Sequence, residues 1–256
     1  MPDAIPLWPT PQQPENPTLT PYLLPGERTR AMLVILPGGG YEVRVDHEKL
    51  NIVRWVNSLG LHAAICDYRV KPARHPAPLH DAQRALRLIR HHAAEWHVDP
   101  GRIGVIGFSA GGHLAGSVGN FGDDGNTTSP DLVARQSGRA DAVIACYAVI
   151  SGLMRSGSFK NLLGPDPDAE LVQRLSLETS VTARNPPTFL WSTAADPVVS
   201  VEHSLRYASA LHAKGIPFAL HVYPKGGHGM ALAPEDAAVS DWTGRCANWL
   251  AELGWR

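Results

Sequence analysis

A serine between two glycines, where an apolar segment meets a helix-forming one, limits most strongly what this chain can fold into. Residues 103–116 read IGVIGFSAGGHLAG, with Ser109 between Gly107 and Gly111. The G-x-S-x-G pattern is typical of a strained turn from a strand into a helix that exposes the serine hydroxyl. A side chain at either glycine would collide with the neighbouring backbone, because strand and helix approach closely there. We therefore expect a strand over 102–108, a turn at Ser109, and a helix directly after it.

Strands and helices are predicted to alternate along most of the chain. Continuous apolar runs, typical of strands buried on both faces, are separated by segments with apolar residues at helical spacing. This alternation predicts an α/β fold with a doubly wound, mostly parallel sheet and helices on both faces. The expected strands cover 31–37, 61–68, 102–108, 140–150, 187–193 and 217–223, and the expected helices cover 46–58, 81–96, 199–214 and 236–253.

Two segments depart from this alternation within what the length predicts to be one domain over 1–256. Residues 1–30 form a proline-rich N-terminal segment in which only 18–24 resembles a strand. Pro21 would confine that strand to a sheet edge, because proline cannot donate to a ladder. Residues 151–186 are polar and rich in proline and glycine. We expect them to form an insertion over the rim of the sheet and a wall of any pocket.

Composition and charge exclude several classes of function. The formal net charge is −1, so the chain has no basic field to hold nucleic acid. The N-terminus lacks the basic and apolar regions of a signal peptide, and no run of about 18 apolar residues occurs. We expect a soluble, cytoplasmic protein without a membrane partner. Cys66, Cys146 and Cys246 lie in apolar segments, which predicts buried free thiols. The oligomeric state stays open.

The residues after the predicted strands supply the partners that Ser109 needs. A serine hydroxyl becomes a nucleophile when a histidine takes its proton and a carboxylate orients that histidine. In this architecture the order along the chain is serine, acid, histidine. Asp196 in TAADPVV and His228 in KGGHGM fit that order. We predict Ser109, Asp196 and His228 as the catalytic residues, and three other carboxylates compete for the acid: Glu202, Asp166 and Asp168.

Three glycines after the strand at 31–37 provide hydrogen-bond donors. Acyl transfer needs N–H groups aimed at the oxygen that becomes negative, and glycines place bare backbone beside a substrate. We predict an oxyanion hole from the N–H groups of Gly39, Gly40 and Ala110, with Gly38 as an open alternative. Tyr41 follows directly and is predicted to bind substrate, with plain packing as the competing interpretation.

Cofactor and metal sites are not expected. A dinucleotide-binding turn needs a third glycine where this chain has Val43. The twelve histidines show no ligand spacing with a supporting cysteine or carboxylate cluster. We therefore predict no cofactor and no metal.

Taken together, the motifs resemble α/β-hydrolases of the esterase and lipase type, in particular small bacterial enzymes similar to acetyl xylan esterases and feruloyl esterases. The resemblance begins near residue 30 and rests on LPGGGY, VDPGRIGVIGFSAGGHLA, STAADPVV and YPKGGHGM. It implies hydrolysis of carboxylic esters, commonly acetyl or other short acyl groups on carbohydrates, without a cofactor. Pro37 stands where the broader pattern has a histidine before the glycines, which leaves the bracing of that loop open.

We predict a serine carboxylesterase that acts on a small-molecule ester through an acyl-enzyme. One alternative is a serine peptidase of the prolyl-oligopeptidase type, although the chain has no room for the gating domain that such enzymes usually carry. The other is a non-catalytic binding scaffold that kept the fold. The complete set of nucleophile, base, acid and glycines argues against the scaffold.

Overall fold

A computed structural model describes residues 2–154 and 157–256 of the chain. Within these residues one eight-stranded sheet has the order β1-β2-β4-β3-β5-β6-β7-β8. Neighbouring strands from β4 across to β8 are parallel, whereas β1 and β2 pair in antiparallel fashion. The predicted mostly parallel α/β sheet is thereby confirmed. The strands are β1 Ile5–Pro6, β2 Thr18–Tyr22, β3 Arg30–Leu36, β4 His62–Asp67, β5 Val98–Phe108, β6 Val143–Cys146, β7 Thr188–Thr193 and β8 Phe218–Tyr223.

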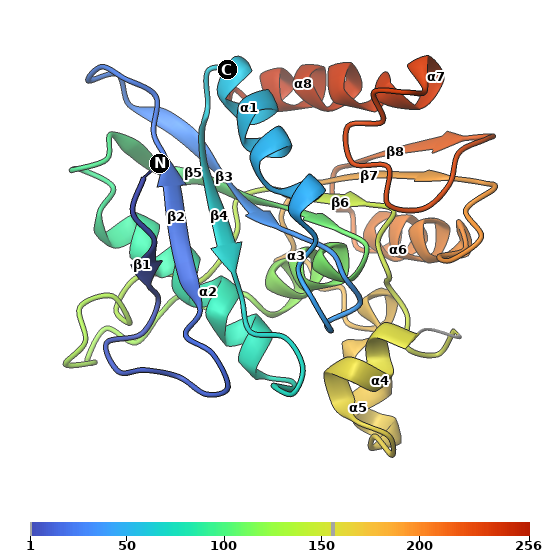
Figure 1. The fold of residues 1–256 in the computed structure, drawn as a ribbon, viewed down its shortest axis with the longest axis horizontal. Helices are drawn as coiled ribbons and strands as arrows, with labels where there is room; N and C mark the ends of the chain where they lie inside the picture. Colours follow the sequence, from blue (N-terminus) through green and yellow to red (C-terminus); the bar gives the residue numbers. More distant parts are fainter. Residues whose placement is uncertain (1, 155–156) are drawn as a thin grey trace.

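Helices cover both faces of the sheet (Figure 1). The buried side chains of α2, α3 and α6 belong to one apolar cluster, and those of α1 and α8 belong to the other. Each helix has an apolar side that the sheet removes from water, which is the main driving force for this layering. The helices are α1 Leu50–Ser58, α2 Ala77–His91, α3 Ala110–Phe121, α4 Gly157–Leu163, α5 Ala169–Leu175, α6 Glu202–Ala213, α7 Ala237–Ser240 and α8 Trp242–Glu252.

The N-terminal strand differs from the prediction. It was expected at an edge, but β2 is the second strand from the edge, because the two-residue β1 pairs with it. A strand of two residues leaves no readable alternation, so the sequence could not predict it. The pairing covers only Thr18 and Leu19, whereas Pro21 pairs with Ala64 of β4 on the other side. At Pro21, β2 therefore has no partner on the side of β1, so the missing N–H of proline leaves no hydrogen bond unmade there.

Helix ends also differ from the prediction. The helix expected over 81–96 begins at Ala77, four residues earlier, and ends at His91. Proline is accommodated in its first turn because the N–H groups there have no intrahelical partner. The helix expected over 236–253 is two helices, α7 and α8. Asp236 caps α7 by accepting the N–H groups of Ala238 and Val239.

Residues 151–186 contain α4, α5 and a short 3-10 turn, Leu177–Thr179. Figure 1 shows α4 and α5, in yellow, extending beyond the sheet. Phe159 and Leu162 of α4 are buried in the same apolar cluster as α2 and α3. This segment is therefore packed onto the body of the fold at the end where β5 gives way to α3.

Candidate active site

Ser109 occupies the turn between β5 and α3 in a conformation that few residues other than glycine adopt. Its φ is 52° and its ψ is −116°. Such backbone costs about 1–3 kcal/mol and is concentrated at functional sites. A Cβ on Gly107 would lie 2.0 Å from the carbonyl oxygen of Gly111, and one on Gly111 would lie 2.1 Å from that of Leu36. The two glycines thus permit the close crossing of strand and helix that holds Ser109 at the turn.

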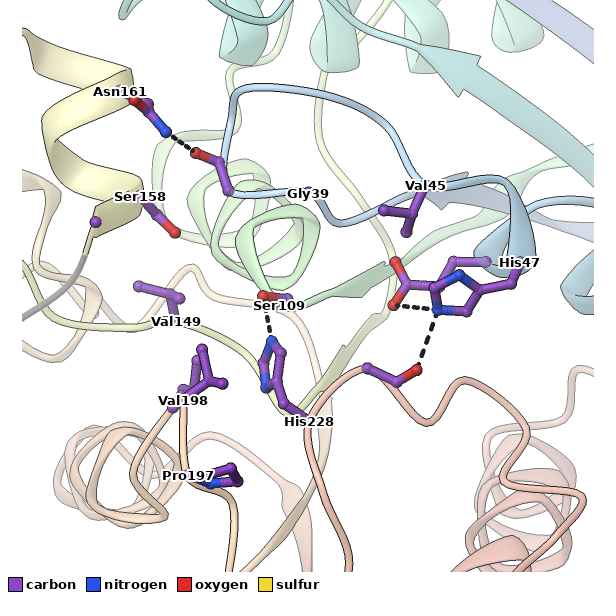
Figure 2. Close-up of a pocket in the computed structure, with 15 residues that line it drawn as sticks. Gly39, Val45, His47, Ser109, Val149, Ser158, Asn161, Pro197, Val198 and His228 are labelled. Carbon is purple, nitrogen blue, oxygen red and sulfur yellow. Dashed lines mark hydrogen bonds and ion pairs between the residues drawn. The ribbon is translucent and has the colours of Figure 1, made fainter.

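His228 and Asp196 reach Ser109 from the loops after the last two strands. Asp196 follows β7 and His228 follows β8. His228 Nε2 lies 2.8 Å from Ser109 Oγ, and Nδ1 lies 2.7 Å from Asp196 Oδ2 (Figure 2 draws the bond to Ser109). With the proton on Nδ1, Nε2 presents a lone pair to the hydroxyl. The structure therefore brings the three predicted residues into one hydrogen-bonded chain.

The environment of Asp196 favours the ionised carboxylate. Its Oδ1 accepts the N–H groups of Val198 at 2.8 Å and Val199 at 3.0 Å, while Oδ2 faces His228. Burial raises the pKa of Asp196, but the hydrogen bonds from His228 and from the two N–H groups outweigh it and lower the pKa below its ordinary value. A fixed negative charge beside His228 stabilises the imidazolium that forms when Ser109 gives up its proton.

The competing carboxylates lie elsewhere. Glu202 is the first residue of α6 and its carboxylate lies 3.7 Å from Arg206. Asp168 caps α5 by accepting the N–H of Leu171, and Asp166 is exposed in the turn before it. Among the described residues, the carboxylate that is hydrogen-bonded to His228 is that of Asp196.

The glycine loop after β3 runs beside Ser109, as Figure 2 shows for Gly39. Gly39 has a φ of 125°, and a Cβ there would lie 2.3 Å from the carbonyl oxygen of Val43. Only glycine fits this position without moving the backbone. Gly39 and Gly40 both line the cavity that contains Ser109.

The backbone N–H groups near Ser109 differ in whether a protein group already accepts them. Gly38 donates its N–H to Glu48 Oε2 at 2.6 Å. Within residues 2–154 and 157–256, no protein group accepts the N–H of Gly39, Gly40 or Ala110. The three predicted donors can therefore serve a ligand oxygen, whereas the open alternative, Gly38, is already used.

Glu48 is a buried residue of this site that sequence reasoning missed. It is 1% exposed, and its Oε1 accepts the hydroxyl of Tyr147 at 2.6 Å. The same Tyr147 oxygen accepts the N–H of Ala231, three residues after His228, at 2.9 Å. Burial raises the pKa of Glu48 despite the hydrogen bonds from Tyr147 and Gly38. One carboxylate thus joins the glycine loop, the loop after β6 and the loop that carries His228.

No sequence signal marked Glu48, because it is one acidic residue in the polar run VDHEKL and its burial depends on the fold. The bracing left open by Pro37 also becomes visible here. The hydroxyl of Tyr68 donates to the carbonyl oxygen of Pro37. Tyr68 and Glu48 therefore hold the glycine loop through hydrogen bonds with Pro37 and Gly38, and no histidine before the glycines is needed.

The prediction that Tyr41 binds substrate is wrong. Its side chain is 1% exposed, and its hydroxyl lies 2.8 Å from His113 Nδ1. The ring also packs edge-on against Tyr68, with centroids 6.2 Å apart. The ring of Tyr41 therefore belongs to the buried core, and the packing interpretation is the correct one.

Ser109 and His228 open into a cavity of about 780 Å³. Figure 2 shows Val149, Val198, Ser158 and Asn161 on one side of Ser109, and Val45 and His47 on the other. Ser158 and Asn161 come from α4, and Asn161 donates to the carbonyl oxygen of Gly40 at 2.9 Å. Helix α4, within residues 151–186, therefore forms one wall of the cavity and contacts the glycine loop. The lining residues are Gly39, Gly40, Val45, His47, Glu48, Ser109, Val149, Gly157, Ser158, Asn161, Pro197, Val198, Val199, His228 and Gly229.

Comparison with known proteins agrees with this geometry. A sequence profile of the BD-FAE family matches residues 22–211. The chain belongs to the BD-FAE family. This places it among the α/β-hydrolases of the esterase type, as its motifs predicted, and the sheet order and helix layers agree with that fold.

Individual relatives of this BD-FAE chain carry esterase and xylanase names. It is 37% identical over 235 residues to endo-1,4-beta-xylanase B of Butyrivibrio fibrisolvens, covering 89% of this chain and 36% of that protein. It is 29% identical to an acetylxylan esterase of Xylanibacter ruminicola, covering 90% of this chain and 47% of that protein. The chain thus spans less than half the length of these two curated relatives.

A solved structure of similar length gives a closer match. An acetyl ester-xyloside bifunctional hydrolase from Caldicellulosiruptor lactoaceticus superposes with a TM-score of 0.97 at 44% identity, covering 99% of this chain and 97% of that one. The carboxylesterase Cest-2923 from Lactobacillus plantarum superposes with a TM-score of 0.83 at 25% identity. Each of these two superpositions covers 99% of this chain, so it includes most of residues 151–186 as well as the rest of the fold.

Three further observations concern the described residues alone. Their helices include none with both the length and the hydrophobicity that a membrane span requires, and the cytoplasmic location stays a prediction. No group of three or more His, Cys, Asp or Glu side chains in 2–154 and 157–256 could hold a metal ion. The three cysteines are buried and free, as predicted.

Proposed function

We propose that this protein is a serine carboxylesterase that hydrolyses esters of short acyl groups, including acetyl groups on carbohydrates. The observation that carries the proposal is the chain from Asp196 through His228 to Ser109, with bonds of 2.7 and 2.8 Å, at the floor of a cavity lined by Gly39 and Gly40. The names of the acetylxylan esterase and acetyl ester hydrolase relatives support the ester class.

In the first half of the reaction Ser109 Oγ attacks the ester carbonyl carbon while His228 Nε2 takes the hydroxyl proton. The carbonyl oxygen becomes negative and accepts the N–H groups of Gly39, Gly40 and Ala110. The bond to the alcohol oxygen then breaks, and His228 returns its proton to that oxygen. Asp196 keeps the proton on Nδ1 throughout and stabilises the charged ring.

In the second half a water molecule replaces the alcohol. His228 Nε2 takes a proton from the water, whose oxygen attacks the acyl carbon bound to Ser109. The same N–H groups hold the oxyanion. Its collapse breaks the bond to Ser109 Oγ and releases the acid, and His228 Nε2 gives its proton to Oγ to restore the hydroxyl. No step requires a metal or an organic cofactor, since every proton and charge has a partner among these residues.

The cavity walls favour a short acyl group. Val149 lies directly against the nucleophile, because its N–H donates to the carbonyl oxygen of Ser109 at 3.1 Å. Val198 and the α4 residues Ser158 and Asn161 line the same side of the cavity (Figure 2). A long chain on this side would have to pass these side chains, whereas an acetyl group would not.

Glycoside cleavage, suggested by the xylanase and xyloside names of two relatives, has weaker support in this cavity. Glycosidases usually need two carboxyl groups on either side of the scissile bond. Among the described residues that line the cavity, Glu48 alone carries a carboxyl group. Both of its oxygens already accept hydrogen bonds, from Gly38 and Tyr147.

The proposal is tested by initial rates on nitrophenyl acetate, butyrate and decanoate, together with an aminoacyl nitroanilide. We expect kcat/KM to be highest for acetate or butyrate and the nitroanilide to be cleaved barely or not at all. An amine must receive the His228 proton as it departs, whereas nitrophenolate is a weakly basic leaving group that departs without it. Dominant nitroanilide cleavage would favour the peptidase alternative, and a decanoate optimum would favour a lipase. No turnover of any substrate would favour the binding scaffold.

A further inference from the structure

A second cavity, of about 670 Å³, adjoins the first. His47 lies in the walls of both cavities, and its Nε2 is 3.0 Å from the carbonyl oxygen of Gly229. The chain also continues from one to the other, because Gly229 lines the first and Met230 lines the second. Two residues span at most about 7 Å, so the second cavity begins close to His228. Its lining residues are His47, Asn51, Arg54, Trp55, Met230, Ala231, Leu232 and Pro234.

The lining of this cavity combines an aromatic ring with planar polar groups. Asn51, Arg54 and Trp55 have the spacing that places side chains on one face of helix α1. Trp55 is partly exposed and its ring packs against Trp242, with centroids 5.1 Å apart, which limits its movement. Arg54 Nη1 donates to Asn51 Oδ1 at 3.1 Å, and both side chains are exposed. The guanidinium has five N–H donors, so most of them stay available for other partners.

This combination suits a sugar ring better than a hydrocarbon chain. The C–H face of a pyranose can lie on an indole ring, while its hydroxyl groups bond to amide and guanidinium groups. An alkyl chain in the same place would remove Arg54 and Asn51 from water without replacing their hydrogen bonds, which costs free energy. Met230 and Leu232 also line this cavity and add apolar contact.

We propose that the second cavity binds a pyranose ring of the alcohol part of the ester, with the ester itself at Ser109. This inference rests on the proposed esterase function and names its leaving group. The alcohol oxygen must come within reach of His228 Nε2 to receive its proton. The loop that carries His228 continues into the second cavity. If one sugar ring carries the acetyl group at Ser109, a second ring linked to it reaches Trp55 and Arg54.

The test compares acetate esters whose alcohols differ in reach and polarity. The substrates are ethyl acetate, whose alcohol is too small to reach Trp55, xylobiose hexaacetate, and phenethyl acetate as an apolar alcohol. We expect Trp55→Leu and Arg54→Ala each to lower the ratio of kcat/KM for xylobiose hexaacetate to that for ethyl acetate by about tenfold. The loss should lie in KM, because these residues bind the alcohol away from the reacting atoms.

Arg245→Ala is the matched control, because Arg245 is an exposed arginine on α8 that pairs with Asp241 and lines neither cavity. It should leave the ratio unchanged. Arg54→Ala keeps the test decisive if Trp55→Leu fails to fold, because Arg54 is exposed.

Three outcomes would overturn the inference. The first is an unchanged ratio in both variants, and the second is a wild-type enzyme that cleaves ethyl acetate but not xylobiose hexaacetate. The third is a loss confined to phenethyl acetate, which would assign the cavity to an apolar alcohol. A wild-type enzyme that cleaves none of the three esters would instead refute the proposed function.

Discussion

Replacing Glu48 by glutamine should impair catalysis although Glu48 does not contact the reacting atoms. Its two oxygens accept hydrogen bonds of 2.6 Å from Gly38 N–H and Tyr147 O–H. Both partners are donors, and the Gly38 N–H cannot reverse its role. The glutamine amide offers one acceptor and one NH₂ group, so one buried donor loses its acceptor. Leaving a buried donor unpaired costs about 1–3 kcal/mol.

The kinetic effect depends on how much of that cost moves the glycine loop. Each 1.36 kcal/mol lost from transition-state stabilisation slows the reaction about tenfold. Complete loss of one oxyanion donor typically costs about 100- to 1000-fold, which sets the upper limit. We therefore expect Glu48→Gln to lower kcat by about 10- to 100-fold with little change in KM, since an oxyanion contact forms fully only in the transition state.

The assay is kcat and KM on nitrophenyl acetate across a range of pH, with unfolding curves to confirm that the variant folds. Because burial raises the pKa of Glu48, its protonation in the wild type also converts one oxygen into a donor. Wild-type kcat should therefore rise with pH as Glu48 ionises, above the ordinary range of a glutamate, and Glu48→Gln should lack that rise. Tyr147→Phe is the control, because it leaves the bond from Gly38 to Glu48 in place and should lower kcat less. Unchanged kcat and an unchanged pH profile in Glu48→Gln would show that Glu48 does not hold the glycine loop in its active position.

Further predictions concern the acid, the glycine loop, the buried histidines and metals. Asp196→Asn should lower kcat/KM by orders of magnitude, on the order of 10⁴ as in serine proteases, whereas Glu202→Gln should stay near wild type; the reverse pattern would move the acid to Glu202. Gly39→Ala should fold poorly or lose most activity, since its Cβ would meet a carbonyl oxygen at 2.3 Å; wild-type kcat would contradict this. Burial lowers the pKa of His113 and of His203 to about 4. The unfolded chain therefore binds protons that the folded one does not, and the free energy of unfolding in urea should fall as pH drops from about 6.5 to about 4; a flat profile would contradict the burial argument. Dialysis against a strong chelator should leave activity intact, and activity that returned only with zinc would overturn the mechanism.

The sequence predicted those features whose physical cause lies within a short segment. The strand, turn and helix around Ser109 could be predicted from Gly107 and Gly111. In the structure a Cβ at either glycine would collide with a backbone carbonyl group. Asp196 and His228 could be predicted because parallel strands place the loops after them at one edge of the sheet.

Features that depend on distant contacts could not be predicted. Glu48 acquires its role from Tyr147, which is 99 residues away in the sequence. Tyr41 was expected in the cavity because it follows the glycines, yet its hydroxyl meets His113, 72 residues away. The second cavity likewise forms between α1 and the loop after His228, and neither segment alone indicates a ligand.

The most direct test of the central claim is to treat the protein with a fluorophosphonate and to identify the modified residue by peptide mass spectrometry. We expect Ser109 alone to be labelled, with complete loss of ester hydrolysis, because among the described residues this is the hydroxyl that has a base at 2.8 Å in the hydrogen-bonded chain to Asp196. Ser109→Ala should fold normally, resist labelling and lose nearly all hydrolysis of nitrophenyl acetate. Labelling of another residue, or a Ser109→Ala variant that keeps most of its activity, would show that Ser109 is not the nucleophile.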